Sequence, residues 1–324
     1  MNGNTKLVFM KVEKSMTKTS KLSLTVKQHI NQSSITCTSM IVTIFGDIVS
    51  QHGSWLWLSS LIKVLEPLGF NDRQVRTSVY RLVQNNWLQG NKVGRCSYYC
   101  FTDFAMAHYE KAARRIYAAE QADWNENWIL VLPISVPEEK KEEFRKSLLW
   151  QGFNTLVSGL YAHPSCDTSS LDEAIHELGL AGNVIILNGS VADLNSQSVI
   201  KTLIKDRWKL SELETNYREF LNFYRPICQQ LLNKQEKPVQ LSTTDSFLLR
   251  AILIHDYRRV LLRDPDFPQA MLPQGWVGYE AHDLVKRMYK VLIEPSTTYI
   301  EENMNNAQGK LPEANNKFYQ RFVS

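Results

Sequence analysis

The residues best suited to recognising another molecule lie between Asn71 and Trp87. Apolar residues recur there at i, i+4, i+7 and i+8, which is the buried stripe of an amphipathic helix. The opposite side carries cations, hydroxyls, an amide and an aromatic ring, the groups that contact base edges and phosphates in a DNA groove. A typical solvated helix face mixes Glu with Lys, whereas we expect no carboxylate on this one. The predicted DNA-binding residues of this helix are Arg73, Gln74, Arg76, Thr77, Tyr80 and Arg81.

The flanking segments are those that a DNA-binding helix requires. Residues 55–68 form a second amphipathic segment, and Gly69 follows it, so a tight turn joins two helices. After the second helix comes a turn that carries Lys92 and Arg95, which we also expect to contact DNA, and then an aromatic-rich strand over 96–102. Helix, turn, helix and basic hairpin is the order of a winged helix, although an ordinary helical subdomain with a surface hairpin fits the pattern alone.

A second cluster of cations lies towards the C-terminus and suits a small anionic ligand. Arg259 and Arg263 are four residues apart, so they share one helix face and repel each other unless carboxylates or phosphates pair with them. Arg258 adjoins them and Trp276 offers an aromatic wall, so we predict that these four residues bind a ligand. The equally supported alternative is that the arginines form internal ion pairs with Asp256, Asp264 or Glu280.

Catalysis has little support in the sequence. No HExxH, GxSxG, Gly-rich phosphate loop or paired Cys–His motif is present. Neighbouring residues such as His282 and Asp283 point apart on a helix, which disfavours a shared acid–base site. The residues available for a metal or acid–base site are His255, Asp256, Asp264, His282 and Asp283. We therefore predict that the protein is not an enzyme and has neither a catalytic site nor a metal site.

The composition is that of a globular protein, with 44% hydrophobic residues among 324 and a net charge of +4. This length allows two or three domains with real cores, and so mild a charge does not by itself indicate nucleic-acid binding. The five cysteines are scattered without CxxC or zinc-finger spacing, which favours free thiols in a reducing cytoplasm. Since no apolar run reaches about 18 residues, we expect a cytoplasmic protein without a transmembrane helix.

Several separated motifs share their order and spacing with one known family. The motifs are residues 41–47, 73–82, 94–99, 253–265 and 272–276. Through them the chain resembles the PaaX family of bacterial repressors, which control operons for phenylacetic acid catabolism, over about residues 39–300. The family usually has Trp-Pro-Gly where this chain has Trp276-Val277-Gly278. The loop backbone is freer here, because Val does not fix φ as Pro does.

The resemblance implies a GntR-like winged-helix repressor of a phenylacetate catabolic operon. Its effector would be phenylacetyl-CoA or a related aryl-CoA thioester, with no cofactor. One recognition helix reads too few base pairs to find a single operator in a genome. We therefore expect a homodimer on a palindromic double-stranded operator, and no membrane partner.

The other segments complete an α+β multidomain protein. Strand and helix patterns alternate over 128–187, which suggests a ferredoxin-like unit, and this part resembles the Cas2-like middle domain of the same family. Cas2 nucleases bind metal through an Asp at the end of their first strand, where this chain has Ile134 and Ser135. A Cas2-like metal-dependent nuclease, or another nucleic-acid enzyme, is therefore the disfavoured alternative.

The predicted segments follow from these patterns. Residues 1–35 hold six lysines and one glutamate, which favours a flexible basic arm. Helical patterns dominate 206–300, and Pro226 should kink or end the first of these helices. The expected segments are the arm (1–35), the winged helix (36–104), a connector helix (105–124), the Cas2-like ferredoxin-like domain (125–205), a C-terminal α-helical domain (206–300) and a loosely ordered tail (301–324).

Overall fold

A computed structural model describes residues 18–323, apart from 33–34, 119–123, 165–167, 192 and 234–240. The described residues form two units. Unit 1 comprises those of Met1–Ala119, Phe220–Arg258 and Ala281–Ser324, and unit 2 those of Glu120–Glu219 and Arg259–Glu280. The mixed α and β content agrees with the predicted fold class. The predicted C-terminal domain over 206–300 is not a unit of its own, because its residues are divided between the two.

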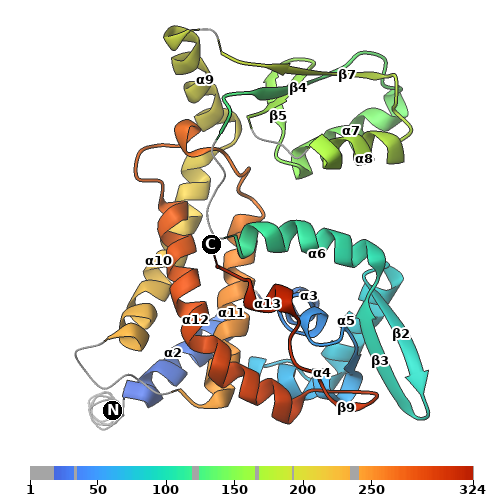
Figure 1. The fold of residues 1–324 in the computed structure, drawn as a ribbon, viewed down its shortest axis with the longest axis vertical. Coiled ribbons are helices and arrows are strands. Elements are labelled where there is room, and N and C mark those ends of the chain that lie inside the picture. The colour runs from blue at the N-terminus through green and yellow to red at the C-terminus, as the bar shows by residue number, and fades with distance from the viewer. Residues whose placement is uncertain are drawn as a thin grey trace, which may run out of the picture. The chain divides into compact units, whose positions relative to one another are not determined.

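The N-terminal part of unit 1 includes the segment that contains the predicted DNA-binding helix (Figure 1). Its elements are α3 (Cys37–Asp47), η1 (Val49–Gln51), β1 (Leu56–Trp57), α4 (Leu58–Leu65), η2 (Glu66–Leu68), α5 (Asp72–Gln84), β2 (Leu88–Val93) and β3 (Cys96–Phe101). The strands form an antiparallel sheet in the order β1-β3-β2. The predicted order of helix, turn, helix and hairpin is confirmed, although Leu56 and Trp57 extend as β1 instead of starting the first helix.

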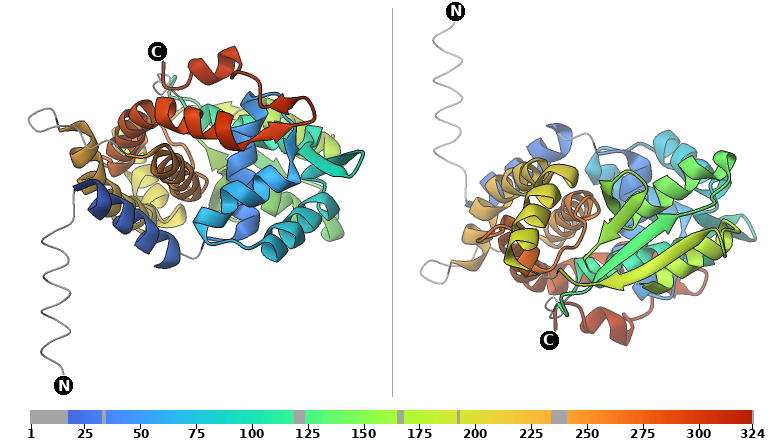
Figure 2. Two further views of the ribbon diagram at one scale, coloured as in Figure 1. Left: turned by 90° about the horizontal axis from the view of Figure 1, so that it is seen from below. Right: turned by 90° about the horizontal axis from the view of Figure 1, so that it is seen from above.

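A helix that the sequence analysis missed, α2 (Lys18–Gln32), packs on unit 1. Leu22, Val26 and Ile30 are buried at i, i+4 and i+8, so one face of α2 lies in the core. Nε2 of His29 lies 2.7 Å from Oδ2 of Asp256, and Figure 2 shows α2 beside the helices of the C-terminal half. The prediction of a flexible arm is therefore wrong for 18–32, and residues 1–17 lie outside the described residues.

The rest of unit 1 is mainly helical. Its elements are α6 (Asp103–Ile116), most of α10 (Leu210–Leu232), α11 (Thr243–Leu261) and α12 (Val277–Asn303), β8 (Asn305–Asn306), β9 (Gly309–Lys310) and α13 (Asn316–Tyr319). α10 continues through Pro226, where the sequence predicted a kink or an end. α11 is apolar nearly all round, with Phe247 to Leu249 and Ala251 to Ile254 buried. A helix of that kind needs apolar neighbours on most of its sides.

The C-terminal tail is ordered against unit 1, contrary to the prediction of a loose end. Leu311, Phe318 and Phe322 are buried, so the segment is held by apolar contacts. Nη1 of Arg321 donates to the backbone oxygen of Asp47, 274 residues earlier, at 2.8 Å. The prediction of a loose end was based on the polar residues 301–309. It did not take account of the apolar residues that follow them.

Unit 2 contains a four-stranded antiparallel sheet in the order β5-β6-β4-β7. Its elements are β4 (Trp128–Pro133), α7 (Glu138–Trp150), β5 (Asn154–Val157), β6 (Leu160–His163), α8 (Thr168–Glu177), β7 (Val184–Gly189), α9 (Leu194–Arg207) and η3 (Gln269–Met271). The predicted single strand over 156–163 is a hairpin, because Gly159, with φ at +79°, reverses the chain. The resulting order βαββαβ is that of a ferredoxin-like unit, as predicted.

Helices α7 and α8 cover one face of this sheet (Figure 1). Ile129 and Val131 of β4 share a core with Phe144 and Leu148 of α7 and with Leu171 of α8. Because side chains alternate along a strand, Leu130 and Leu132 face the other way.

Candidate nucleic-acid interface

Helix α5 is fixed at its start by hydrogen bonds that the sequence only partly predicted. The side chain of Asn71 accepts a hydrogen bond from the backbone nitrogen of Gln74, and Oε1 of Gln74 accepts one from the backbone nitrogen of Asn71, both at 2.9 Å. This capping box satisfies two backbone donors at the helix end. Gln74, predicted as a DNA contact, therefore has a structural partner for its oxygen, while its amide nitrogen is a donor that this capping box does not use.

The two faces of α5 separate as predicted. Val75, Ser78, Val79 and Leu82 are buried, and α5 packs against α3 and α4. The other predicted DNA-binding residues, here called the basic face, are all exposed: Arg73, Arg76, Thr77, Tyr80, Arg81, Lys92 and Arg95. Tyr80 is 65% exposed, so its ring is accessible to a partner surface.

One carboxylate, Asp72, lies next to the basic face, where the sequence predicted none. Nε of Arg76 donates to Oδ1 and Oδ2 of Asp72, one helical turn earlier, at 3.0 and 2.9 Å. Both side chains are more than half exposed, so the pair contributes little, about 0–1 kcal/mol. Asp72 serves the positive end of the helix dipole and holds Arg76 in place on the helix surface.

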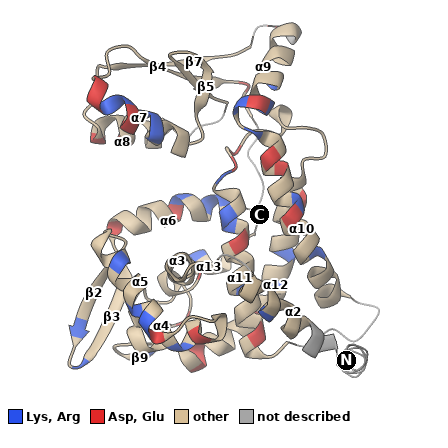
Figure 3. Cartoon of the chain, turned by 180° about the vertical axis from the view of Figure 1, so that it is seen from behind, with Lys and Arg blue, Asp and Glu red and all other residues tan. Residues whose placement is uncertain are grey.

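The β2–β3 hairpin projects beside α5, and Figure 3 shows Lys and Arg on both. Val93 pairs with Cys96, so a two-residue turn of Gly94 and Arg95 closes the hairpin. Gly94 has φ at +62°, a conformation that glycine adopts without strain. Lys92 and Arg95 are exposed at this end, where they can reach a phosphate backbone.

Behind α5, a buried charge cluster joins α3 to the C-terminal half of unit 1. Oδ2 of Asp47 accepts a hydrogen bond from Nε of Arg250, and Oδ1 accepts one from Nη1 of Arg321, both at 2.8 Å. The hydroxyls of Tyr117 and Tyr289 donate to Oδ1 at 2.6 and 2.7 Å. The side chains of Asp47, Arg250 and Arg321 are at most 4% exposed.

The protonation of Asp47 follows from these contacts. Burial alone raises the pKa of a carboxyl, but the two guanidinium groups and the tyrosine hydroxyls outweigh burial and lower the pKa of Asp47 below its usual 3.8. Asp47 is therefore ionised, and the cluster holds two cations for one carboxylate. The sequence does contain a signal for it, since Asp47 and Arg250 each interrupt an apolar run.

Two of the four predicted ligand-binding residues are engaged within the fold. Nη2 of Arg258 donates to the backbone oxygen and Oγ of Ser39 at 3.2 and 3.0 Å. The Trp276 side chain is 5% exposed and packs edge-on against Tyr217, with 6.1 Å between ring centroids. Arg259 and Arg263 are exposed, and their role in ligand binding stays a prediction.

Four of the five residues considered for catalysis have separate partners in the fold. Asp256, proposed in the alternative as an internal ion-pair partner of the arginines, accepts a hydrogen bond from the hydroxyl of Tyr224 at 2.8 Å. The other observed pairs are His255 with Thr43, Asp264 with Tyr217 and Asp283 with Arg287. Among the described residues, no group of three or more His, Cys, Asp or Glu is placed to hold a metal ion. None of the helices described is long and apolar enough to cross a membrane.

Comparison with known proteins gives matches along most of the chain. Family models described as PaaX-like protein, PaaX protein central Cas2-like domain and PaaX-like protein C-terminal domain match residues 36–105, 121–200 and 208–302. The transcriptional repressor PaaX of Escherichia coli K12 is 32% identical over 303 residues, which cover 94% of this chain and 95% of that protein. The similarity therefore extends beyond the 39–300 range of the sequence motifs and into residues 1–35.

A solved structure shares the fold. The uncharacterized protein Rv0674 from Mycobacterium tuberculosis superposes with a TM-score of 0.51 at 18% identity, covering 82% of this chain and 99% of that one. At this identity the likeness concerns the fold alone.

Proposed function

The chain belongs to the PaaX family of transcriptional repressors, and we propose that it represses a phenylacetate catabolic operon by binding operator DNA through a winged helix. It is a regulator and not an enzyme, in keeping with its relation to a transcriptional repressor. A DNA-bound repressor works where the chromosome is, which in bacteria is the cytoplasm. The exposed basic face of α5 and the β2–β3 hairpin is the observation that carries this proposal.

In the proposed complex, α5 enters the major groove. Arg73, Arg76 and Thr77 lie on its N-terminal half, the part of a recognition helix that contacts base edges in helix-turn-helix proteins. The hairpin, with Lys92 and Arg95, contacts the phosphate backbone beside the groove. Arg76 must break its ion pair with Asp72 to bind a base. Because that exposed pair contributes little free energy, breaking it costs little.

The proposed oligomer is a homodimer formed through the uncovered face of the unit 2 sheet. In the strand register, Leu130 pairs with Leu187 and Leu132 with Ile185, so the four side chains share the face opposite α7 and α8. Ile185 and Leu187 are both 47% exposed. Burying such an apolar face against a second copy stabilises a dimer, whose two α5 helices then read a palindromic operator.

The proposed effector is an aryl-CoA thioester such as phenylacetyl-CoA, which releases the repressor from DNA. Release requires that the ligand bind the DNA-incompetent conformation more tightly than the DNA-bound one. A difference of about 1–3 kcal/mol would lower operator affinity about 5- to 150-fold.

The decisive experiment is an electrophoretic mobility shift on the DNA upstream of the protein's own gene. CoA, acetyl-CoA and phenylacetyl-CoA are added in parallel lanes. We expect a specific protein–DNA complex that phenylacetyl-CoA dissociates and that acetyl-CoA leaves intact. No preference for this DNA over a random duplex would refute the repressor proposal, whereas a complex insensitive to phenylacetyl-CoA would refute only the effector.

A further inference from the structure

The buried cluster behind α5 carries an excess positive charge. Asp47 is its one carboxylate, and Arg250 and Arg321 are both within 2.8 Å of it. A buried charge without a partner is costly, and here hydroxyls and aromatic rings stabilise the second cation. The guanidinium carbon of Arg321 lies 4.0 Å from the centroid of the Tyr117 ring. These contacts are with neutral groups, so the cluster keeps a net charge of one positive unit.

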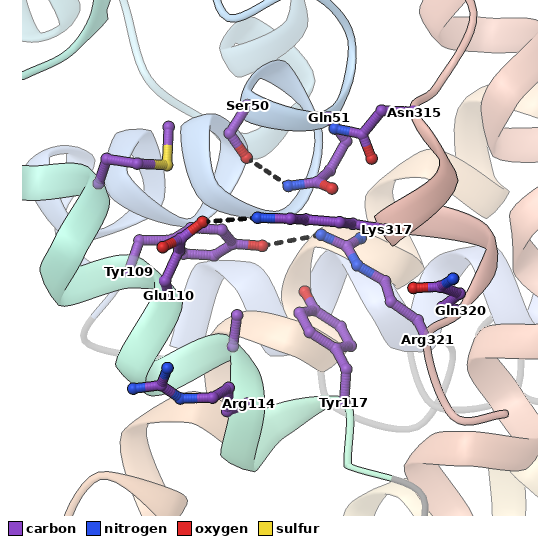
Figure 4. Close-up of a pocket in the computed structure, with 12 residues that line it drawn as sticks. Ser50, Gln51, Tyr109, Glu110, Arg114, Tyr117, Asn315, Lys317, Gln320 and Arg321 are labelled. Carbon is purple, nitrogen blue, oxygen red and sulfur yellow. Dashed lines mark hydrogen bonds and ion pairs between the residues drawn. The ribbon is translucent and has the colours of Figure 1, made fainter. Parts of the chain in front are cut away.

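Arg321 also lines a pocket of about 540 Å³ between α6 and the C-terminal segment, within unit 1 (Figure 4). Tyr109 and Tyr117 form part of its wall, and two further cations, Arg114 and Lys317, lie on its lining. Its one acidic lining residue, Glu110, is paired with Lys317 at 3.0 Å, and both are exposed. With three cations and one carboxylate, the lining has a net positive charge.

The guanidinium of Arg321 retains donors for a ligand. Nη1 donates towards Asp47 and the Tyr289 hydroxyl, and Nη2 donates to the hydroxyl of Tyr109 at 2.8 Å. An arginine has five N–H groups, so the Nε hydrogen and one Nη2 hydrogen have no acceptor in the described part of the chain. Donors of this kind, fixed by packing, suit the oxygens of a phosphate.

We propose that this pocket binds a phosphate group of an organic effector, and that Arg321 links its occupancy to α5. The proposal rests on the proposed function, in which the effector is a CoA thioester with several phosphates. Arg114 and Lys317 meet the phosphate at the mouth and Arg321 meets it inside, while the tyrosine rings flank the attached organic group.

The link to DNA runs through Asp47. Arg321 lines the pocket and also donates to Asp47, the last residue of α3. Helix α3 in turn packs against α5. A phosphate that draws Arg321 towards the pocket weakens its bond to Asp47, which leaves Arg250 as the remaining cation partner of that carboxylate. A ligand in the pocket therefore changes how α3 packs against the recognition helix α5. This gives a physical route by which the ligand can release the protein from DNA.

The test uses two exposed residues whose replacement should act in opposite directions. Arg114→Ala removes a cation from the pocket and should weaken the binding of phenylacetyl-CoA and of CoA about 3- to 10-fold. Glu110→Gln removes the only acidic group of the lining and should strengthen both about 3-fold. Calorimetric titration measures the affinities, and operator binding without ligand should be unchanged in both variants.

Two controls locate the site and the group that is bound. Arg263→Ala tests the competing ligand site just after the end of α11: a loss of affinity in Arg263→Ala without a loss in Arg114→Ala would place the effector there and overturn this inference. Phenylacetate, which has a carboxylate but no phosphate, should not bind detectably, whereas inorganic diphosphate should bind weakly and show the same Arg114→Ala and Glu110→Gln dependence.

The outcomes separate this inference from the proposed function. If Arg114→Ala and Glu110→Gln bind phenylacetyl-CoA and diphosphate as the unaltered protein does, the pocket is not the site, even though phenylacetyl-CoA may still dissolve the operator complex. If diphosphate binding depends on both residues but phenylacetyl-CoA has no effect on operator binding, the pocket is an anion site and the proposed effector is wrong. Phenylacetate binding that depends on Arg114 would overturn the assignment to phosphate.

Discussion

Arg76 is the residue at which base recognition can be separated from nonspecific binding. Arg76→Ala should weaken operator binding by about 1–3 kcal/mol, because a bidentate contact to a base is lost, and should affect a random duplex much less. Fluorescence anisotropy with both duplexes measures the two affinities. Equal losses on both would identify Arg76 as a phosphate contact.

Arg287 offers a matched control for this substitution. Like Arg76, it donates through Nε to an Asp four residues earlier, at 2.9 Å in each case. Its exposed side-chain fraction, 52%, is close to the 56% of Arg76. Arg287→Ala should leave both DNA affinities unchanged, so a loss confined to Arg76→Ala cannot come from breaking a helix-surface ion pair.

Asp47 should be among the residues most important for stability. Asp47→Ala leaves Arg250 and Arg321 buried without their carboxylate, which should lower the free energy of unfolding by about 3–5 kcal/mol. Asp72→Ala breaks the exposed pair with Arg76 and removes a carboxylate from the start of α5, which together should cost about 1 kcal/mol. Urea unfolding of both variants measures the difference, and a small loss in Asp47→Ala would show that the buried cluster contributes little.

At the scale of single elements, the β2–β3 hairpin should contribute affinity without sequence preference. Lys92→Ala and Arg95→Ala should each reduce the slope of log K against log salt by about one, on operator and random DNA alike. Lys290, an exposed lysine of α12, provides the control substitution. A loss confined to the operator would instead mean that the hairpin contacts bases.

At the scale of the whole molecule, the uncovered face of the unit 2 sheet should decide the oligomeric state. Leu187→Lys places a charge among Leu130, Leu132 and Ile185, and burying that charge in an interface is costly. Sedimentation at micromolar concentration should then show a monomer with unchanged helix content. Val291→Lys, at a 40% exposed position of α12, should stay dimeric. A dimer in Leu187→Lys would move the interface elsewhere.

The molecule should also lose stability in mild acid. Burial lowers the pKa values of His52 and His282 below the usual 6.5, because it disfavours the charged ring. Between the depressed folded value and 6.5 the unfolded chain binds more protons than the folded chain, so stability falls as the pH drops below 6.5. Asp47, with its lowered pKa, adds a further loss only when the pH falls below about 3.8.

Thermal unfolding at a series of pH values checks this behaviour. The midpoint should be level between pH 8 and 7 and should decrease from about 6.5 downward. His52→Gln should reduce the decrease, since one of the two rings with a lowered pKa is gone. A midpoint that stays level down to pH 5 contradicts the assignment.

The sequence by itself determined the features that depend on short-range patterns. The i, i+4, i+7, i+8 stripe and the Asn71 cap fix α5, so its buried and exposed faces follow without knowledge of any partner. The family was recognisable because its motifs keep their order and spacing. The basic hairpin was also evident, since Gly94 and the aromatic strand after it are local signals.

Only the tertiary structure decided which distant residues meet. Arg250 and Arg321 lie 203 and 274 residues from Asp47, and no periodicity relates positions so far apart. The order of α2 and of the tail depends on Leu22, Val26, Phe318 and similar residues finding apolar partners elsewhere in the chain. Composition alone favoured disorder for both segments, because local polarity does not report the free energy gained by burying a few apolar side chains against a distant core.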